Sequence, residues 1–437
     1  MTGSSILDAN AYRGSDEDDA LLRRRREVLG PAYRLFYRKP IELVRGSGTR
    51  LYDADGVEYL DAYNNVASVG HAHPHVAAAV AEQVARLTTH TRYLDRALID
   101  YVERLLALLP PSADRMVLTC TGSEANDLAI RLARAATGGT GLIVTSEAYH
   151  GNTDLVTGVS PSLGGGVGVG PDVWLVPAPD PVRRPSDDPA ADLTAAVEGA
   201  LAEMVERGVH PAALLVDSAL SSDGIHTDRG LLTGAVAAVR QAGGVLIADE
   251  VQPGFARTGD SFWGFARHDV VPEIVTMGKP MGNGLPIAGV AAADAIMEPY
   301  AAAAPYFNTF GGTQVAVAAA AAVLDVIERE GLQDNARRVG EYFRSTLTEV
   351  AKRHPVITDV RGAGLYVGVE LVAEAGTTTP GGDLAADVVN GMRERRVLTS
   401  VCGPYGATLK VRPPLPFSTA DVDRFCTELD AVLTALT

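Results

Sequence analysis

Short apolar runs alternate with Ala- and Leu-rich helical stretches between about residues 75 and 330. The runs are MVLTC at 116–120, GLIVTS at 141–146, ALLVDS at 213–218, GVLIADE at 244–250 and EIVTMG at 273–278. Strands that are buried on both faces have such continuous apolar sequences, and the spacing between the runs leaves room for crossover helices. The pattern predicts a doubly wound α/β domain around a mostly parallel sheet.

The two ends of the chain have a different pattern. From residue 41 the apolar positions alternate, and the Asp-Gly pair at 55–56 predicts a β-hairpin. After about residue 325, helical stretches at 333–353, 384–395 and 419–436 accompany the strand-like runs VGVEL and LKVRP, which predicts a smaller α+β domain. The Pro- and Gly-rich insert at 159–190 is predicted to be a surface loop.

These patterns predict a division of the chain into consecutive parts. The parts are a flexible leader at 1–30, an N-terminal segment at 31–70, a large α/β domain at 71–325 and a small α+β domain at 326–437. The leader contains an acidic run followed by Arg23 to Arg26, which is typical of a solvated segment with a short helix. We expect the N-terminal segment to pack with the small domain.

Composition limits the classes of function. The 437 residues carry 38 Lys and Arg against 54 Asp and Glu, and the net charge of −16 repels nucleic acids and anionic membranes. The 3 cysteines lack metal-binding spacing, so we expect reduced thiols and neither a disulfide framework nor a metal site. No apolar run reaches the ~18 residues of a membrane span, and the start lacks a secretory signal pattern. We therefore expect a cytoplasmic protein.

Residues capable of chemistry follow several of the predicted strands. In an open α/β sheet, ligands bind at the carboxyl ends of the strands. After the first run, Gly122 and Ser123 open a helical stretch, where free N–H groups and the helix dipole form an anion site. The same residues also fit a plain helix N-cap made by Thr121 or Ser123. The turn is therefore a candidate phosphate site.

Asp249 and Lys279 follow two other strands. A carboxylate at the end of an apolar strand favours a cationic partner, such as a protonated pyridine nitrogen, although a capping role fits equally well. Lys279 lies in TMGKPMGNGLP, a tight loop that would hold it against buried strand ends. Burial lowers a lysine pKa and favours the neutral amine, which attacks carbonyl carbons; a solvated surface lysine is the alternative.

Further candidates are an aromatic pair and an arginine. Tyr149 and His150 precede a glycine and could lay an aromatic face on a flat ligand, or they could be core residues. Arg412, in LKVRPPLP, suits bidentate binding of a carboxylate, and an ordinary surface arginine is the alternative.

Taken together, these segments closely resemble the class III (ornithine/ω-type) aminotransferases of pyridoxal phosphate (PLP) fold type I, over about residues 30–435. The matching text is YDADGVEYLDAYNNVASVGHAHPHVAAAV, TGSEANDLAIRLAR, AYHGNT, IADEVQPGFARTG, TMGKPMGNGLP, FNTFGGTQVAVAAA and LKVRPPLPFS. Within the class, NNVASVGH and MGKPMGNG are most similar to the alanine-glyoxylate aminotransferase 2-like branch, which also contains amino-phospholyases.

The resemblance implies a role for each matched residue. Lys279 would bind PLP covalently and move the proton at the substrate Cα, and Asp249 would pair with the pyridinium nitrogen. Cofactor contacts would come from Gly122, Ser123, Tyr149, His150, Val251 and Gln252. Thr309 would reach the phosphate from the neighbouring subunit, so the resemblance implies a homodimer with shared active sites. Arg412, with Asp217 as a partner acid, would bind the substrate carboxylate.

The resemblance predicts a PLP-dependent aminotransferase with a ping-pong mechanism, which moves an amino group from an amino acid or amine to a keto acid or aldehyde. The alternative is an amino-phospholyase, or another PLP lyase, decarboxylase or epimerase, on the same scaffold. Departures from the branch are Leu285 in place of His, Thr313 and Gln314 in place of Asn and Pro, and Asp217 in place of Glu. A non-catalytic relative would lack Lys279, and the chain lacks the GxGxxG pattern of a Rossmann oxidoreductase.

Overall fold

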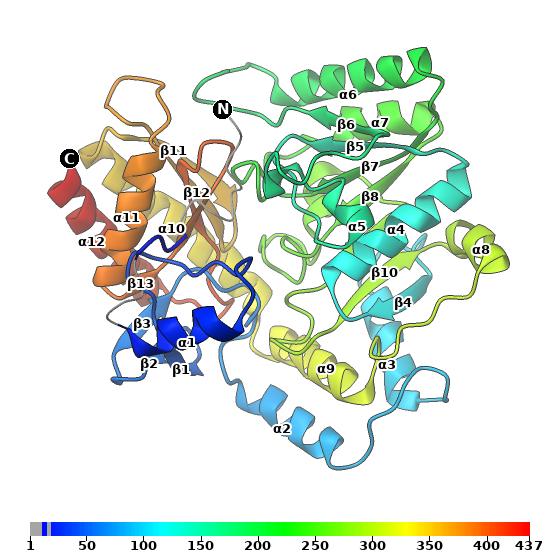
Figure 1. Ribbon diagram of the computed structural model, residues 1–437, viewed down its shortest axis with the longest axis horizontal. Helices are drawn as coiled ribbons and strands as arrows, with labels where there is room; N and C mark the ends of the chain where they lie inside the picture. The colour runs from blue at the N-terminus through cyan, green and yellow to red at the C-terminus, as the bar shows by residue number, and fades with distance from the viewer. Residues whose placement is uncertain (1–10, 15–18) are drawn as a thin grey trace.

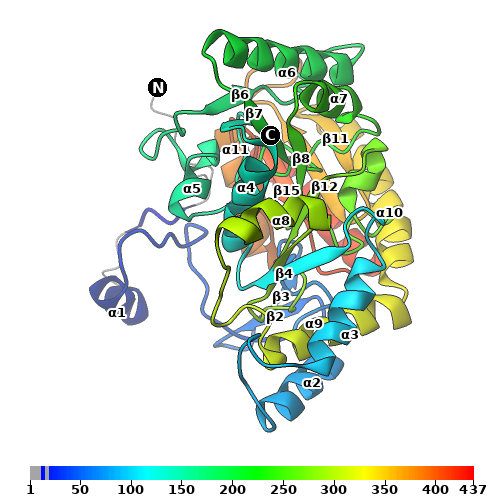
Figure 2. The same ribbon diagram turned by 90° about the vertical axis from the view of Figure 1, so that its right-hand side faces the viewer.

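The computed structural model describes residues 11–14 and 19–437 (Figure 1). Most of the acidic run of the leader, at 16–18, lies outside the described residues. Within the leader, α1 (Ala20–Val28) is a helix with no buried residue, and it stands away from the rest of the molecule in Figure 2. In the described part of the chain, no helix is both long enough and apolar enough to cross a membrane.

A seven-stranded sheet forms the centre of the larger part of the molecule. Its strands, in spatial order, are β4 (Arg115–Thr119), β10 (Ala288–Ala292), β9 (Ile274–Met277), β8 (Val245–Asp249), β7 (Pro211–Asp217), β5 (Gly141–Thr145) and β6 (Val173–Val176). The strands β9, β8, β7, β5 and β6 pair in parallel, whereas β10 pairs antiparallel with both β4 and β9. The prediction of a mostly parallel sheet is confirmed.

Helices cover both faces of this sheet, which explains the continuous apolar runs. On β7, Leu215 packs in a core cluster with α4, while Leu214 and Val216 face a second cluster on the other side. The helices α4 (Gly122–Thr137) and α8 (Asp294–Ala303) lie together on one face (Figure 2). On the other face, α6 (Pro189–Glu206) and α7 (Thr233–Gln241) contribute buried side chains to the second cluster.

The predicted surface loop at 159–190 is wrong in part. Its VWLV sequence forms the edge strand β6, which pairs in parallel with β5, and α6 begins at Pro189. The side chains of β6 alternate in burial, with Trp174 and Val176 buried and Leu175 exposed, because one face of this short edge strand meets solvent. The remaining helices before the C-terminal part are α2 (Pro74–Val84), α3 (Arg96–Leu106), α5 (Asp154–Thr157) and α9 (Gln314–Arg329), with 3₁₀ turns η2 (Pro161–Leu163) and η3 (Gly264–His268).

The two ends of the chain meet in a smaller unit beside the large sheet (Figure 1). The predicted hairpin is confirmed: β2 (Arg50–Asp53) and β3 (Glu58–Asp61) are antiparallel, and Gly56 has φ +81° in the turn between them. Antiparallel to β2 is β1 (Leu43–Ser47), and β3 pairs in parallel with β13 (Val397–Leu398), which joins the N-terminal segment to the C-terminal part.

A four-stranded antiparallel sheet and three helices complete this unit. The strands are β11 (Ile357–Ala363), β12 (Tyr366–Leu371), β15 (Thr408–Val411) and β14 (Ser400–Cys402), and the helices are α10 (Leu332–Arg353), α11 (Gly382–Glu394) and α12 (Thr419–Leu436). The exact domain borders at 71 and 325 stay predictions, and residue 325 lies within α9.

Candidate active site

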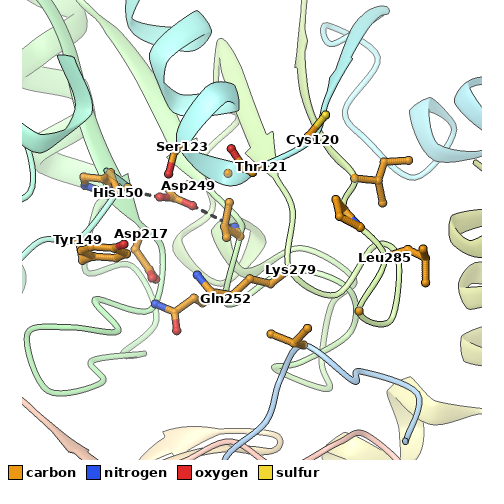
Figure 3. Close-up of a pocket in the computed structure, with 17 residues that line it drawn as sticks. Cys120, Thr121, Ser123, Tyr149, His150, Asp217, Asp249, Gln252, Lys279 and Leu285 are labelled. Atoms are coloured by element: carbon orange, nitrogen blue, oxygen red, sulfur yellow. Dashed lines mark hydrogen bonds and ion pairs between the residues drawn. The ribbon is translucent and has the colours of Figure 1, made fainter. Parts of the chain in front are cut away.

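A cavity of about 290 Å³ opens where several strands of the large sheet end (Figure 3). The structure brings nine of the eleven predicted site residues to its wall. They are Gly122, Ser123, Tyr149, His150, Asp217, Asp249, Val251, Gln252 and Lys279. Arg412 and Thr309 do not line this cavity in the single chain. Carboxyl ends of parallel strands meet at one sheet edge, which explains why residues so distant in sequence converge there.

Asp249 is a buried carboxylate held by three hydrogen bonds. His150 Nδ1 lies 2.7 Å and Asn126 Nδ2 2.9 Å from its Oδ2, and the Val251 backbone N–H donates to its Oδ1 at 3.0 Å. Burial opposes the charged form, but the hydrogen bond and charge of His150, the Val251 N–H and the charge of Lys279 outweigh it and lower the pKa of Asp249. The carboxylate therefore stays ionised and can meet a cation in the cavity.

Lys279 lies directly after Gly278, just beyond the end of β9. Figure 3 shows its side chain reaching into the part of the cavity between Asp249 and Gln252. Burial and the nearby Arg412 lower the pKa of Lys279, although Asp249 and Asp217 act in the opposite direction. A lower pKa increases the fraction of neutral amine, which is the nucleophilic form.

The N-terminus of α4 forms a second wall. Thr121 caps the helix in a reciprocal capping box with Glu124, and this leaves Gly122 and Ser123 in the first turn beside the cavity. A Cβ on Gly122 would lie 3.0 Å from a Val251 methyl group, so the wall tolerates only glycine without a shift. The helix cap and the available helix N-terminus, which the sequence offered as alternatives, are therefore present together at this turn.

A glycine turn orients Ser123. Ser123 Oγ accepts a hydrogen bond from the Asn152 backbone N–H at 3.1 Å and donates to Asn152 Oδ1 at 3.0 Å. The preceding Gly151 has φ +144°, and a Cβ there would lie 2.4 Å from Ser123 Oγ. The turn after His150 therefore packs directly against the helix end.

Gln252 connects the cavity with the smaller unit. Its Oε1 accepts hydrogen bonds from Arg412 and from the Tyr366 hydroxyl, the latter at 3.2 Å. The Arg412 guanidinium lies 4.6 Å from the ring centre of Tyr63, and its buried Nε has no hydrogen-bond partner among the described residues. Arg412 is 8% exposed, so it is a buried cation that retains capacity for an anion.

Asp217 lines the cavity but does not form an ion pair with Arg412 in the described structure. Its Oδ1 instead accepts the Ala219 backbone N–H at 2.8 Å. Burial and the charge of Asp249 raise the pKa of Asp217, and Lys410 partly offsets this rise. Asp217 and Arg412 were predicted to be partners, but in the single chain each contacts other groups instead.

Thr309 is exposed, in a segment beside the cavity mouth. The neighbouring Asn308 accepts a hydrogen bond from the thiol of Cys120, which lines the cavity, at 3.4 Å. The structure of one chain therefore holds this segment near the cavity without bringing Thr309 into its wall.

Sequence reasoning did not identify Asn126 as a site residue. It is fully buried and contacts Asp249 from α4. The available signal was a polar side chain among Ala125, Ala129 and Ile130 on the buried side of that helix. A buried amide must satisfy several hydrogen bonds, so such a position indicates a specific polar partner.

The cavity fits the cofactor that the sequence predicts. A flat, cationic heteroaromatic ring with a phosphate and an aldehyde needs an acid, an aromatic face, an anion cradle and an amine, and the wall offers each of these. His150 Nε2 is also buried and without a hydrogen-bond partner among the described residues, which leaves a polar atom available beside the cavity.

Comparisons with known proteins agree with this geometry. The family model described as aminotransferase class-III matches residues 36–433. The chain is 39% identical to an alanine–glyoxylate aminotransferase 2-like protein of Drosophila melanogaster, covering 95% of this chain and 87% of the relative. It is 35% identical to ethanolamine-phosphate phospho-lyase homolog 1 of Caenorhabditis elegans, covering 99% and 97%.

A solved structure is similar throughout. A phospholyase from Arthrobacter in complex with phosphoethanolamine superposes with a TM-score of 0.92 at 40% identity, covering 95% of this chain and all of that one (100%). Fold, cavity and sequence thus lead to one family. The chain belongs to the class III aminotransferases, a family of PLP-dependent enzymes.

Proposed function

We propose that this protein is a PLP-dependent aminotransferase that moves an amino group from an amino acid or amine donor to a keto acid or aldehyde acceptor. The observation that carries the proposal is the arrangement of the Lys279 amine, the Asp249 carboxylate and the α4 N-terminus around one cavity. When bound, PLP links covalently to amines and withdraws electrons from the substrate Cα.

Lys279 is the residue that binds the cofactor and moves the proton. Its lowered pKa supplies the neutral amine needed for attack on an aldehyde. With the cofactor bound, the same side chain would take the proton from the substrate Cα as a general base and return it as a general acid.

The remaining residues of the cavity wall would bind and orient the cofactor. Asp249 stays ionised and would hold the ring nitrogen in its positive form, while Gly122 and Ser123 would hold the phosphate at the helix N-terminus. Tyr149 and Val251 line the wall and would exclude water from the reacting atoms of a bound ring.

Arg412 is the residue that recognises the substrate carboxylate. It is buried, and its guanidinium donates a hydrogen bond to the neutral amide of Gln252 and lies over the Tyr63 ring. A carboxylate offers a stronger, bidentate partner than an amide oxygen, so a substrate can replace Gln252 there. Gln252 would then be available as a hydrogen-bonding partner of the cofactor.

A second candidate is elimination of phosphate from a phosphorylated amino alcohol. It is favoured by the similarity to the Arthrobacter phospholyase and to the phospho-lyase homologue of C. elegans. Both reactions begin with the same proton transfer at Cα by Lys279, and they differ in whether a leaving group departs from the next carbon.

A two-part assay tests the proposal. The purified protein is first loaded with PLP, and its visible spectrum is followed while single amines are added without any acceptor. Aminotransferase activity predicts conversion of the cofactor to its amine form by a donor, and restoration by pyruvate or glyoxylate. Release of inorganic phosphate from phosphoethanolamine without consumption of a keto acid would establish the second candidate instead. A protein that does not bind PLP would refute both.

We also propose a homodimer, because apolar side chains gather near the cavity mouth. Phe307 and Phe310 are 43% and 69% exposed, and Tyr93 and Leu94 are 64% and 105% exposed. The two segments touch, since His90 and Phe307 have ring centres 5.7 Å apart. A Leu94→Glu variant should sediment as a monomer and lose activity; a dimeric, active variant would contradict this interface.

A further inference from the structure

Asn126 is a buried amide that links three elements behind the wall of the cavity. Its Nδ2 lies 2.9 Å from Asp249 Oδ2 and 2.8 Å from the His150 backbone oxygen. Its Oδ1 accepts a hydrogen bond of 2.7 Å from the hydroxyl of Thr276 on β9. Both Asn126 and Thr276 are 0% exposed, so water does not substitute for any of these partners.

The chemistry of the partners fixes the orientation of this amide. The backbone oxygen of His150 can only accept, and the ionised carboxylate of Asp249 can only accept. The NH₂ group of Asn126 must therefore face them, and its oxygen must face the Thr276 hydroxyl. A flipped amide would place an oxygen against two acceptors and lose the hydrogen bonds to His150 and Asp249.

The hydrogen bonds on Asp249 are distributed unevenly between its two oxygens. Oδ2 takes both side-chain donors, from His150 and Asn126, whereas Oδ1 takes only the Val251 backbone N–H. Two donors on one oxygen fix the plane of the carboxylate from behind. Oδ1 consequently keeps a lone pair for a further donor in the cavity that Asp249 lines.

We propose that Asn126 and Thr276 are positioning residues that fix the plane of the Asp249 carboxylate for the ring nitrogen of the cofactor. This inference rests on the proposed function, because it needs PLP in the cavity. Thr276 orients the amide, the amide orients the carboxylate, and the carboxylate holds the ring. Neither residue lines the cavity, so neither touches substrate or cofactor.

Three substitutions separate this role from simple packing. Thr276→Val keeps the shape of the side chain and removes the hydroxyl that orients Asn126, and Thr276→Ser keeps that hydroxyl. Asn126→Asp places a second carboxyl group against Asp249 and removes the amide donor. The matched control is Thr399→Val, because Thr399 is also 0% exposed and donates to a backbone oxygen, that of Lys410.

Three measurements are made on each variant: the Kd of the apo-enzyme for PLP, the pH midpoint of the visible absorbance of the bound cofactor, and urea unfolding of the apo-enzyme. We expect Thr276→Val and Asn126→Asp to weaken PLP binding by roughly ten- to hundredfold, because each disturbs the charge-assisted hydrogen bond from Asn126 to Asp249. Both should also shift the spectral midpoint. Thr276→Ser should restore both values.

Thr399→Val should lower stability in urea and leave the Kd and the spectrum unchanged. The inference is wrong if Thr276→Val binds PLP with the wild-type Kd and midpoint, or if Thr399→Val changes them equally. If Asn126→Asp does not fold, the comparison of Thr276→Val with Thr276→Ser still tests the inference. A wild-type protein that fails to bind PLP would instead refute the proposed function, so the two failures are distinguishable.

Discussion

Gly151 makes the contact between the turn after His150 and the helix end, and Gly151→Ala tests it. The φ angle of +144° is one that alanine rarely adopts, and such strain costs about 1–3 kcal/mol of unfolding free energy. The added Cβ would also lie 2.4 Å from Ser123 Oγ, whereas ordinary contact begins at 3.4 Å. Ser123 or the turn must therefore move by the difference, about 1 Å.

A displacement of this size acts on the proposed phosphate cradle. Misplacement of a binding group by about 1 Å costs roughly a hundredfold in catalysis. We expect Gly151→Ala to weaken PLP binding and to lower kcat/KM by about this factor, with a loss of stability that is separately measurable. PLP titration of the apo-enzyme gives the first value, and urea unfolding gives the second.

Gly168→Ala is the matched control. Gly168 also has positive φ, +79°, but a Cβ there would have no neighbour within 4 Å. This variant should therefore carry backbone strain without a collision and should bind PLP like the wild type. Equal PLP affinities of Gly151→Ala and Gly168→Ala would contradict the proposed effect of the Gly151 contact on Ser123.

Three further predictions concern the charged groups. Lys279→Ala should abolish turnover and the visible absorbance of the bound cofactor. Its apo-protein should unfold in urea as cooperatively as the wild type. Turnover within tenfold of the wild type would contradict the role of Lys279. Arg412→Gln should raise the KM for pyruvate or glyoxylate at least tenfold, which corresponds to about 1.4 kcal/mol of binding free energy. The KM for amines that lack a carboxylate should change little. An unchanged KM for the keto acids would exclude the carboxylate contact. Burial and Arg412 lower the pKa of Lys410 to about 7 from an unfolded value of 10.5. The folded state therefore binds fewer protons than the unfolded state between these values, so stability should rise with pH across that window, and Lys410→Met should flatten the rise in urea unfolding at pH 7 and 9. Parallel pH profiles for the two proteins would contradict this.

Sequence patterns predicted the sheet where burial on both faces left a strong signal. The runs that became β5, β7 and β8 are continuous and apolar because helices cover each side. The pattern did not predict β6, which is short and lies in a Pro- and Gly-rich segment. It also did not predict β10, whose AGVAA sequence has a single β-branched residue. Short or Ala-rich strands depend on their neighbours more than on their own propensity.

The candidate site was predictable to the extent that it consists of strand ends. Gly122, Asp249 and Lys279 follow strands directly, so their convergence follows from sheet topology. The contacts between side chains did not follow from the pattern. The hydrogen bond from Asn126 to Asp249 joins residues 123 positions apart, and the Gln252–Arg412 contact joins two units of the fold. Only three-dimensional packing specifies such pairs.

The parallel pair of β3 and β13 has a consequence for biosynthesis. Leu60 pairs with Val397, 337 positions later (397 − 60), so the N-terminal strands leave the ribosome long before their partner exists. At ~5–20 residues per second, the delay is roughly 20 to 70 s. During this interval the edge of β3 is an open template for other chains. A higher concentration of nascent chains should therefore increase association through this edge until the last strands emerge.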